Sequence, residues 1–267
     1  MGHGWQGGMC AALYFLNTAH LDEAINVTNI AMIPKVKDQR CVIDFRPISL
    51  CNILYKIISK VLANKLKKIL AMIISQNQST LLPGRLITDN ILAAYETFHT
   101  MYTRLWSKVG FMGIKLGISK AYDKVEWEFL DVVMEKMGFS GRWRSLIKAC
   151  VRTMSYSVVV NGQPVGNIKP SRGLRQGDPI SPYVFLLCVE AFSFMLNKAE
   201  SMRVITGVPS SKRGPRLSHL FFAHDSLLFC NANSVEWHKI TNILEKYEEA
   251  LGQKLNKDKK SIFSLEI

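Results

Sequence analysis

The residues with the clearest capacity for chemistry lie in one short stretch, HLFFAHDSLLFC, residues 219 to 230. Two apolar runs, Leu220 to Ala223 and Leu227 to Cys230, flank the polar pair His224 and Asp225. Short apolar runs rich in aromatics and bounded by polar residues predict two strands joined by a tight hairpin. A carboxylate at the tip of a rigid hairpin suits metal binding, because the strands fix its position while the tip stays hydrated. Asp is also a common turn residue, so this stretch alone leaves both interpretations open.

Two basic loops are candidates for binding anions. SRGLRQGDPISPYVF (171–185) carries Arg172 and Arg175 and leads into a predicted helix from near Pro182 to about Lys198. Exposed backbone amides and the helix dipole at such a junction attract anions, although the signal is weak by itself. The second loop follows a predicted strand and contains DFRPISL (44–50), where Pro47 forces the residue before it into an extended conformation. Its basic residues could hold phosphate or simply form a solvated loop.

Composition indicates a basic globular protein. The 267 residues include 34 Lys and Arg against 21 Asp and Glu, which gives a net charge of +13 and a pI near 9.5. Such an excess favours a polyanionic partner, because a positive field attracts phosphate and binding releases condensed counterions. An anionic membrane fits less well, because the basic residues are dispersed rather than lined along one amphipathic helix.

The cysteines and apolar segments predict an intracellular location. The six cysteines show no CxxC pair and no metal-ligand spacing, so we expect reduced core residues. No secretory signal is evident. The longest apolar stretch, Tyr183 to Leu196, is too short to span a bilayer and contains Glu190. We therefore expect no membrane partner and a location in the nucleus or cytoplasm.

Hydrophobic periodicity predicts the elements that must position these residues. We expect the first ten residues to be loose and 207–216 to be a linker. Helices are predicted at 53–74, from the loop 78–90 to about 106, at 119–137, from about 182 to 198, and at 234–251, capped by Ser234 and closed by Gly252. Strands are predicted at 27–33, at 111–118, in a hairpin 155–169 turned by Asn161-Gly162, and at the tail. Five lysines of the first helix are either a solvated face or a nucleic-acid track; they are Lys56, Lys60, Lys65, Lys67 and Lys68.

Six segments, in this order along the chain, resemble one family. They are IPKVKDQRCVIDFRPISLCNILYKIISKVLANKL (33–66), QSTLLPGRLITDN (78–90), KLGISKAYDKVEW (115–127), RGLRQGDPISP (172–182), FAHD (222–225) and LNKDKKS (255–261). Together they resemble the reverse transcriptases of LINE-type, non-LTR retrotransposons, in the form abundant in plant genomes. The resemblance implies RNA-directed DNA synthesis and an α+β right-hand polymerase with fingers and palm, here with the thumb absent or truncated. We expect a loose segment at 1–20, a fingers-like part at 21–110, and a palm at 111–267 with a fingers insertion around 140–180.

The resemblance also implies partners and a nucleotide-binding set. The family binds an RNA template, a DNA primer and a deoxynucleoside triphosphate. Its basic fingers residues correspond to Lys35 and Arg46. The bulky residue that rejects a ribose 2′ hydroxyl corresponds to Tyr122, the glutamine near nucleotide and template to Gln176, and the basic residue proposed to assist pyrophosphate departure to Lys259.

The implied metal site departs from the family at two of three positions. The family holds two Mg²⁺ ions with three aspartates, in KLDMSKAYD and FADD, where this chain has KLGISKAYD and FAHD. Gly117 and His224 therefore replace two catalytic aspartates, and Asp225 alone remains. Glycine offers no ligand, and imidazole suits Zn²⁺ or Cu²⁺ better than Mg²⁺. We do not expect Asp123, six residues further on, to substitute.

These departures predict a degenerate copy that has lost polymerase activity and binds Mg²⁺ weakly. The alternative is a reverse-transcriptase-like module kept for binding nucleic acid without synthesis. A third possibility is a protein-interaction segment or a surviving fragment with no biochemical task.

Overall fold

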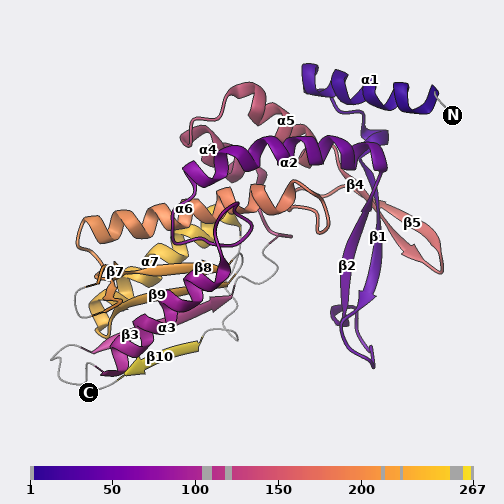
Figure 1. Cartoon of the computed structure of the whole chain (residues 1–267). Helices are drawn as coiled ribbons and strands as arrows, with labels where there is room; N and C mark the ends of the chain where they lie inside the picture. Colours follow the sequence, from indigo (N-terminus) through magenta and orange to yellow (C-terminus); the bar gives the residue numbers. More distant parts are fainter. Residues whose placement is uncertain are drawn as a thin grey trace. The chain divides into compact units, whose positions relative to one another are not determined.

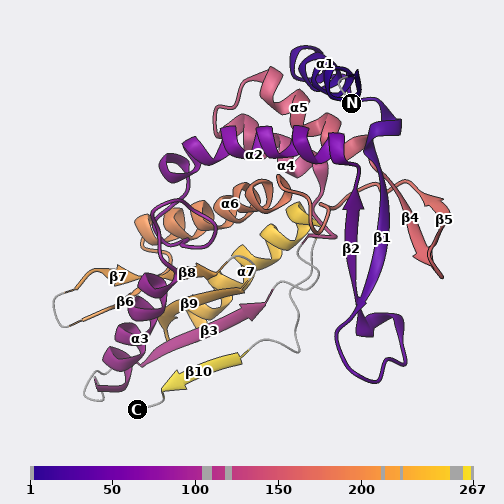
Figure 2. The same ribbon diagram turned by 45° about the vertical axis from the view of Figure 1, so that its right-hand side comes forward.

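The chain folds around two separate four-stranded sheets, each with its own helices (Figure 1, Figure 2). The structure is a computed structural model that describes residues 3–103, 110–117, 122–211, 214–222, 225–252 and 261–265. The chain divides into two compact units, Met1–Lys68 with Tyr122–Phe185 and Ile69–Ala121 with Leu186–Ile267. Each unit is therefore assembled from two stretches of sequence, and two of the three boundaries fall inside helices α2 (Ile53–Ile73) and α6 (Ser181–Ser201).

The first unit contains the mixed sheet β2-β1-β4-β5. Its strands are β1 (Val27–Pro34), β2 (Phe45–Cys51), β4 (Ser155–Val160) and β5 (Gln163–Ile168). Its helices, besides its part of α2 and the start of α6, are α1 (His3–Thr18), α4 (Trp127–Lys136), α5 (Gly141–Arg152) and the short 3₁₀ turns Glu23–Asn26 and Val42–Asp44. Asn161 and Gly162 both have positive φ, 50° and 79°, which confirms the predicted type I′ turn between β4 and β5.

The second unit contains the antiparallel sheet β10-β3-β9-β8. Its strands are β3 (Phe111–Gly117), β8 (His219–Phe222), β9 (Asp225–Asn231) and β10 (Ser261–Leu265), with a small pair formed by β6 (Val208–Pro209) and β7 (Arg216–Leu217). Its helices are α3 (Ile87–Thr103), α7 (Ser234–Leu251) and its parts of α2 and α6. The predicted hairpin at 219–230 and the predicted last strand are both confirmed.

Helices cover both faces of the second sheet. On one face Phe98 of α3 packs against Phe229, with ring centroids 5.3 Å apart. On the other face Phe192 of α6 lies between Phe221 and Tyr247 of α7, at 5.5 Å and 4.7 Å. Alternation along β8 and β9 produces this division, because successive side chains of a strand point to opposite faces.

Two segments that we expected to be irregular are ordered. The opening forms α1 rather than a loose segment, because Phe15 is 1% exposed and its burial outweighs the cost of the glycines. The expected linker at 207–216 contains β6 and β7 instead, which pair antiparallel. The N-cap of α7 is Asn233 rather than the predicted Ser234, because the Asn233 side chain accepts a hydrogen bond from the Glu236 amide.

The helix predicted at 119–137 begins only at Trp127, and residues 118–121 lie outside the described part of the chain. Two carbonyls of the segment 122–126 bond outside the helix: the amides of Leu174 and Gly173 donate to the carbonyls of Tyr122 and Val125 at 2.7 and 2.8 Å. The loop at 172–176 therefore competes successfully for groups that would otherwise extend the helix.

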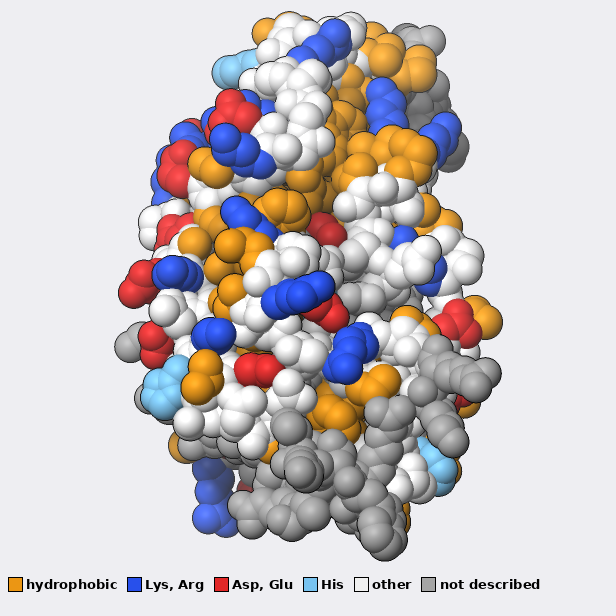
Figure 3. All heavy atoms as spheres, turned by 90° about the vertical axis from the view of Figure 1, so that its left-hand side faces the viewer, with side chains coloured by type: hydrophobic (Ala, Val, Ile, Leu, Met, Phe, Trp, Pro, Cys, Tyr) orange, Lys and Arg blue, Asp and Glu red, His pale blue; other side chains and the backbone are white. Residues whose placement is uncertain are grey.

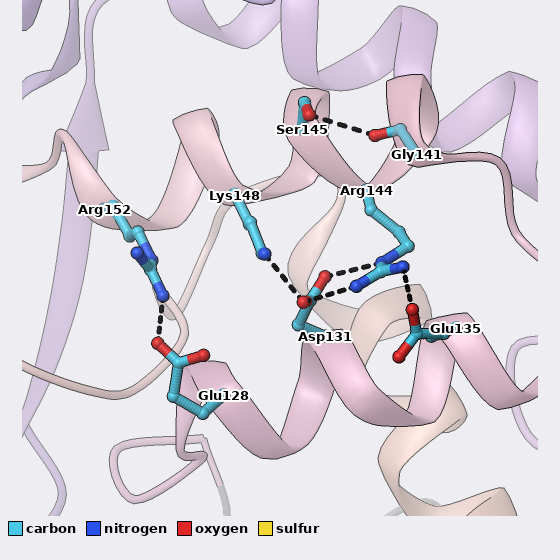
Figure 4. Close-up of polar contacts among 8 residues, drawn as sticks. All are labelled: Glu128, Asp131, Glu135, Gly141, Arg144, Ser145, Lys148 and Arg152. Atoms are coloured by element: carbon cyan, nitrogen blue, oxygen red, sulfur yellow. Dashed lines mark hydrogen bonds and ion pairs between the residues drawn. The ribbon is translucent and has the colours of Figure 1, made fainter.

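Helix α5 was missed by the periodicity argument and is anchored to α4 by ion pairs (Figure 4). Asp131 contacts Arg144 at 2.7 Å and Lys148 at 2.6 Å. Arg144 also reaches Glu135 at 2.7 Å, and Arg152 pairs with Glu128. Hydrogen bonds from Arg144 lower the pKa of Asp131 to about 2. Charge pairing with α4 holds α5 in place, and the buried residues Leu146, Ile147, Cys150 and Val151 also follow helical spacing, so the periodic signal was present in the sequence.

The cysteine prediction is confirmed for four residues and wrong for two. Cys51, Cys150, Cys188 and Cys230 are buried, whereas Cys10 and Cys41 are exposed; all six are free thiols. Desolvation raises the pKa of Cys150, Cys188 and Cys230 to about 12, so these thiols are unreactive.

In the described part of the chain, one helix, α6, is long and apolar enough to cross a membrane. Because 61% of the apolar stretch of α6 is buried inside the protein, α6 has the burial of a core helix.

Gly113 in β3 allows α3 to approach the sheet. A Cβ atom at this position would lie 2.7 Å from Cε1 of Phe98. We expect Gly113→Val to lower the free energy of unfolding by roughly 1–3 kcal/mol, because a side chain would overpack this contact. Urea unfolding measures the loss, and Gly113→Val with Phe98→Ala should recover part of it. An unchanged unfolding midpoint for the single variant would contradict the packing described here.

A buried polar network surrounds His219 at the start of β8. Nε2 of His219 lies 2.9 Å from both Asn77 Nδ2 and Ser193 Oγ, and Nδ1 lies 3.0 Å from Ser218 Oγ. Because the Asn77 amide nitrogen can only donate, Nε2 accepts and Nδ1 carries the proton. Ser218 in turn donates to Glu200 Oε2 at 2.6 Å. Burial lowers the pKa of His219 to about 3.

The lowered pKa of His219 predicts acid sensitivity. Protonation is easier in the unfolded chain, where the pKa is about 6.5, so this stabilisation is complete above pH 6.5 and is lost as the pH falls toward 3. We expect the free energy of unfolding to drop by about 2 kcal/mol between pH 7 and 5 from this group. Urea titrations should show a weaker pH dependence for His219→Gln than for a matched variant of the exposed His20, His20→Gln. Equal pH dependence in both variants would show that His219 does not control acid stability.

Candidate functional site

The register of β3 and β9 places two positions of the expected metal site directly opposite each other. Gly117, the last residue of β3, is paired with Asp225, the first residue of β9. Opposed residues of an antiparallel pair have Cβ positions about 4.5–5.5 Å apart and point to the same face. A side chain at position 117 would therefore lie beside the Asp225 carboxylate. The sequence prediction that these positions meet is consistent with this register.

Asp225 is half-buried and borders a hollow of about 340 Å³ at the end of the sheet. The other lining residues are Lys115, Phe222, Ser226 and Leu227. Across the hairpin Asp225 pairs with Phe222, which fixes its backbone. Asp225 thus has the position expected of a hairpin acid, at the first residue of the second strand. His224 lies outside the described residues.

The donors in this hollow do not fit a pair of Mg²⁺ ions. Mg²⁺ requires near-octahedral oxygen coordination, which protein sites provide with carboxylates, water and substrate phosphate. Opposite Asp225 stands Gly117, which has no side chain. Over the described ranges, no group of three or more His, Cys, Asp or Glu side chains is arranged to hold a metal.

The two basic fingers positions, Lys35 and Arg46, lie near the tip of the β1–β2 hairpin in the first unit. Arg46 of β2 pairs with Ile33 of β1, and its side chain is exposed. Nζ of Lys35 donates to the carbonyl of Ile43 at 2.9 Å, and the Lys35 side chain is otherwise exposed. β2 is an edge strand, as expected from Pro47. Both cations therefore remain accessible to an anionic ligand.

Tyr122 and Gln176 also lie in the first unit. The Tyr122 ring stacks on Phe185 with centroids 5.0 Å apart, and partial burial raises the pKa of its hydroxyl. The Gln176 carbonyl accepts from the Ser49 amide at 3.0 Å, which ties its loop to β2. Nε2 of Gln176 donates to Oδ1 of Asp123 at 3.3 Å. Asp123 precedes α4 rather than lying on it, which corrects its expected place on a helix.

The prediction of an anion site at Arg172 and Arg175 is wrong for Arg175. Its side chain is 2% exposed, donates to Thr28 Oγ1 at 3.0 Å and to Asn26 Oδ1, and lies 4.1 Å from the centre of the Tyr55 ring. Arg172 is partly exposed and pairs with Glu126 at 3.1 Å. Protein groups pair with both guanidinium groups, but among the described residues the buried Nε of Arg175 has no hydrogen-bond partner.

The sequence analysis did not identify the polar residues that anchor the loop at 172–178 to helix α2. Tyr55 donates to Asp178 Oδ2 at 2.6 Å, and Ser59 donates to Asp178 Oδ1. Desolvation raises the pKa of Tyr55 far above its ordinary value. Tyr55 and Ser59 stand on the buried face of α2, so a polar residue on a predicted apolar face was the available signal. The remaining predicted position, Lys259, lies outside the described residues.

A palm-like antiparallel sheet with an acidic hairpin, together with a helical unit built on a long β-hairpin, defines a template-directed polymerase of the right-hand class. The sequence model described as "Reverse transcriptase (RNA-dependent DNA polymerase)" matches residues 33–267. The chain belongs to this family. It is a reverse transcriptase domain of the kind found in non-LTR retrotransposons.

Curated relatives agree with this assignment. The chain is 27% identical over 232 residues to the transposon TX1 149 kDa protein of Xenopus laevis, covering 87% of this chain and 17% of that protein. It is 23% identical over 210 residues to the Pol polyprotein of the type-1 retrotransposable element R2 of Popillia japonica, covering 78% of this chain and 28% of that protein. An uncharacterized mitochondrial protein of Arabidopsis thaliana, AtMg01250, is 47% identical over 68 residues, covering 26% of this chain and 56% of that protein. The chain spans about a sixth of the first of these retroelement proteins and just over a quarter of the second.

Solved structures show the same fold. Telomerase from Candida albicans, in complex with a fragment of telomeric RNA, superimposes with a TM-score of 0.59 at 14% identity, covering 91% of this chain and 43% of that chain. Apo telomerase from Candida tropicalis gives a TM-score of 0.57 at 13% identity, covering 97% and 55%. The α+β fingers-and-palm fold predicted from the sequence is confirmed.

The opposition of Gly117 and Asp225 predicts that one substitution restores a metal ligand pair. We expect Gly117→Asp to be stabilised by Mn²⁺ because two carboxylates would then face each other. For a Kd of about 1 mM, 10 mM MnCl₂ adds about 1.4 kcal/mol, or roughly 2–4 °C in Tm. Thermal unfolding with and without MnCl₂ measures the shift, and Gly117→Asn is the matched neutral control. Equal shifts for the two variants would contradict the proposed geometry.

Proposed function

We propose that this chain is a degenerate reverse transcriptase domain that has lost DNA synthesis and still binds nucleic acid. The observation that carries the proposal is the pairing of Gly117 with Asp225, at a position where the family places a metal-binding aspartate. The family depends on two Mg²⁺ ions, and the second departure, His224, removes another carboxylate from the sequence. One carboxylate would bind Mg²⁺ weakly and out of position.

The size of the expected defect follows from geometry. A misplacement of about 1 Å at a reacting centre costs roughly a hundredfold in rate. Loss of two of three ligands therefore supports a fall to background. Each change needs one altered base in an Asp codon, which fits a reading frame that drifted after selection relaxed.

The proposed partners are an RNA template, a DNA primer and a deoxynucleoside triphosphate, with no membrane partner. Exposure of Lys35 and Arg46 and the net charge of +13 support retained binding of phosphates. The short match to an Arabidopsis thaliana protein supports a plant-type origin. We propose a nuclear or cytoplasmic location, which the free cysteines support.

A second candidate function is a module retained for nucleic-acid binding without synthesis. The buried support of the 172–178 loop favours it, because the positions of Gln176 and its neighbours remain ordered although the metal ligands have changed. The two candidates share the fold and differ in how strongly nucleic acid is bound. The degenerate copy retains only residual binding, whereas the module binds an RNA–DNA duplex tightly with a steep salt dependence.

Primer extension on an RNA template tests the loss of synthesis. We expect no extension above the blank for the unmodified chain with Mg²⁺ or Mn²⁺. We expect at least about a hundredfold more product from the double variant Gly117→Asp with His224→Asp, because both carboxylates return. The matched control carries Gly117→Asn with His224→Asn and should stay at background.

Robust extension by the unmodified chain would contradict the proposal. Failure of the double variant, with its fold verified by circular dichroism and Mn²⁺ binding demonstrated, would show that the two substitutions do not account for inactivity.

A further inference from the structure

The exposed half of α2 carries an uncompensated positive charge. Between Asp44 and Asp89 the sequence contains seven Lys and Arg and no Asp or Glu, so this stretch supplies +7 of the chain's +13. Five of the seven are lysines within one helical segment, from Lys56 to Lys68. We call these five residues the α2 lysine face; they are Lys56, Lys60, Lys65, Lys67 and Lys68. At 1.5 Å per residue the segment extends about 18 Å.

The buried side of the helix turns these lysines outward. Ile58, Leu62, Leu66 and Leu70 are fully buried at helical spacing. The lysines occupy the remaining arc: four are exposed, and Lys67 is half-buried with its Nζ 5.1 Å from the centre of the Tyr183 ring. The helix is thus fixed by its core side and presents charge on the other.

No acidic side chain of the described residues pairs with this face. Six other cations of the first unit have acidic partners; the pairs are Arg40–Asp38, Arg144–Asp131, Lys148–Asp131, Arg152–Glu128, Lys169–Glu23 and Arg172–Glu126. Figure 4 shows Glu128, Asp131 and Glu135 of α4 paired with Arg144, Lys148 and Arg152 of α5. On the face drawn in Figure 3, basic and acidic side chains likewise lie among one another. The α2 lysine face differs because like charges stand together along one helix, which is unfavourable without an external anion.

We propose that the α2 lysine face binds the phosphodiester backbone of RNA or DNA. Lysine ammonium groups act as point charges toward phosphate, so this contact adds affinity without reading sequence. The five lysines are distinct from the family positions Lys35, Arg46, Tyr122 and Gln176, so their contact with nucleic acid would add to the contacts of those residues. The inference rests on the proposed function in taking nucleic acid as the ligand, and it is independent of the loss of catalysis.

An anionic membrane fits this face less well than nucleic acid. Amphipathic helices that bind membranes insert their apolar side into the lipid interface, while their basic side contacts the headgroups. The main apolar stripe of α2 is buried in the protein, and its exposed large apolar side chains are limited to Ile53 and Ile57 near one end and Met72 at the other. Five lysines beside so little exposed apolar surface favour the backbone of a nucleic acid, where binding is driven by release of counterions.

Fluorescence anisotropy with a fluorescein-labelled 20-bp RNA–DNA duplex tests the proposal from 50 to 200 mM KCl. The α2 variant carries Lys56→Gln, Lys60→Gln, Lys65→Gln and Lys68→Gln, since glutamine keeps helix propensity. We expect its Kd at 100 mM KCl to rise roughly tenfold or more. The slope of log K against log salt should fall by about 2 to 4, because each lost phosphate contact removes about 0.9. The corresponding four Lys→Arg changes should preserve the slope.

The matched control removes the same charge from exposed cations elsewhere. It carries Lys136→Gln, Lys198→Gln, Arg203→Gln and Lys246→Gln, whose side chains are exposed. We expect a change in Kd below about threefold from this variant, because only the overall field is reduced. Circular dichroism and Tm verify that all variants are folded.

Each possible outcome either supports or overturns the inference. Equal slopes for the α2 variant and the control would overturn this inference while leaving binding by the domain intact. Absence of salt-dependent binding by the unmodified chain would overturn both this inference and retained binding in the proposed function. Loss of binding to phosphatidylserine vesicles by the α2 variant, with duplex binding unchanged, would assign the face to membranes and overturn the inference.

Discussion

The antiparallel pairing of β3 with β9 is the constraint on which the functional interpretation depends. Its register sets Gly117 opposite Asp225 and sends both positions to the face that carries the hollow beside Lys115. A shift of one residue would reverse the faces of a whole strand, so the packing of Phe98 and Phe192 on opposite faces also fixes the geometry of the site. The hydrogen bonds between β3 and β9 therefore determine both the packing of the sheet and the positions of residues 117 and 225. A carboxylate can be lost from the end of such a strand without disturbing the packing that holds the register.

A second constraint acts in the first unit, beneath the loop at 172–178. Arg175 and Asp178 are both buried. The Tyr55 ring contacts Arg175, and the Tyr55 hydroxyl donates to Asp178. Buried charge is costly unless hydrogen bonds satisfy it, and Asn26, Thr28 and Ser59 provide these bonds. The network holds Gln176 against β2. Because none of it depends on metal ligands, the loop can persist in a domain that no longer synthesises DNA.

The distribution of charge separates two uses of lysine and arginine. Across α4 and α5 the cations meet acids and fasten one helix to another. Along α2 they meet none among the described residues, and the core side of the helix fixes their direction. Lysine and arginine thus link two helices in one place and face the solvent in another. The two cases differ in whether an acidic side chain lies beside the cation.

The sequence by itself determined the family, the hairpin at 219–230, the type I′ turn at Asn161 and the chemical change at Gly117, since each depends on local pattern or on the identity of one residue. The apolar spacing of α5 was also present in the sequence but was not recognised. The helix at the N-terminus and the burial of Arg175 were not predictable, because they depend on contacts between residues far apart in the chain, such as Arg142 with the Leu16 carbonyl and Arg175 with Asn26 over 149 positions. The tertiary structure decided them, because the energy of a buried charge or a packed aromatic is set by what surrounds it, and spacing along the sequence does not encode that environment.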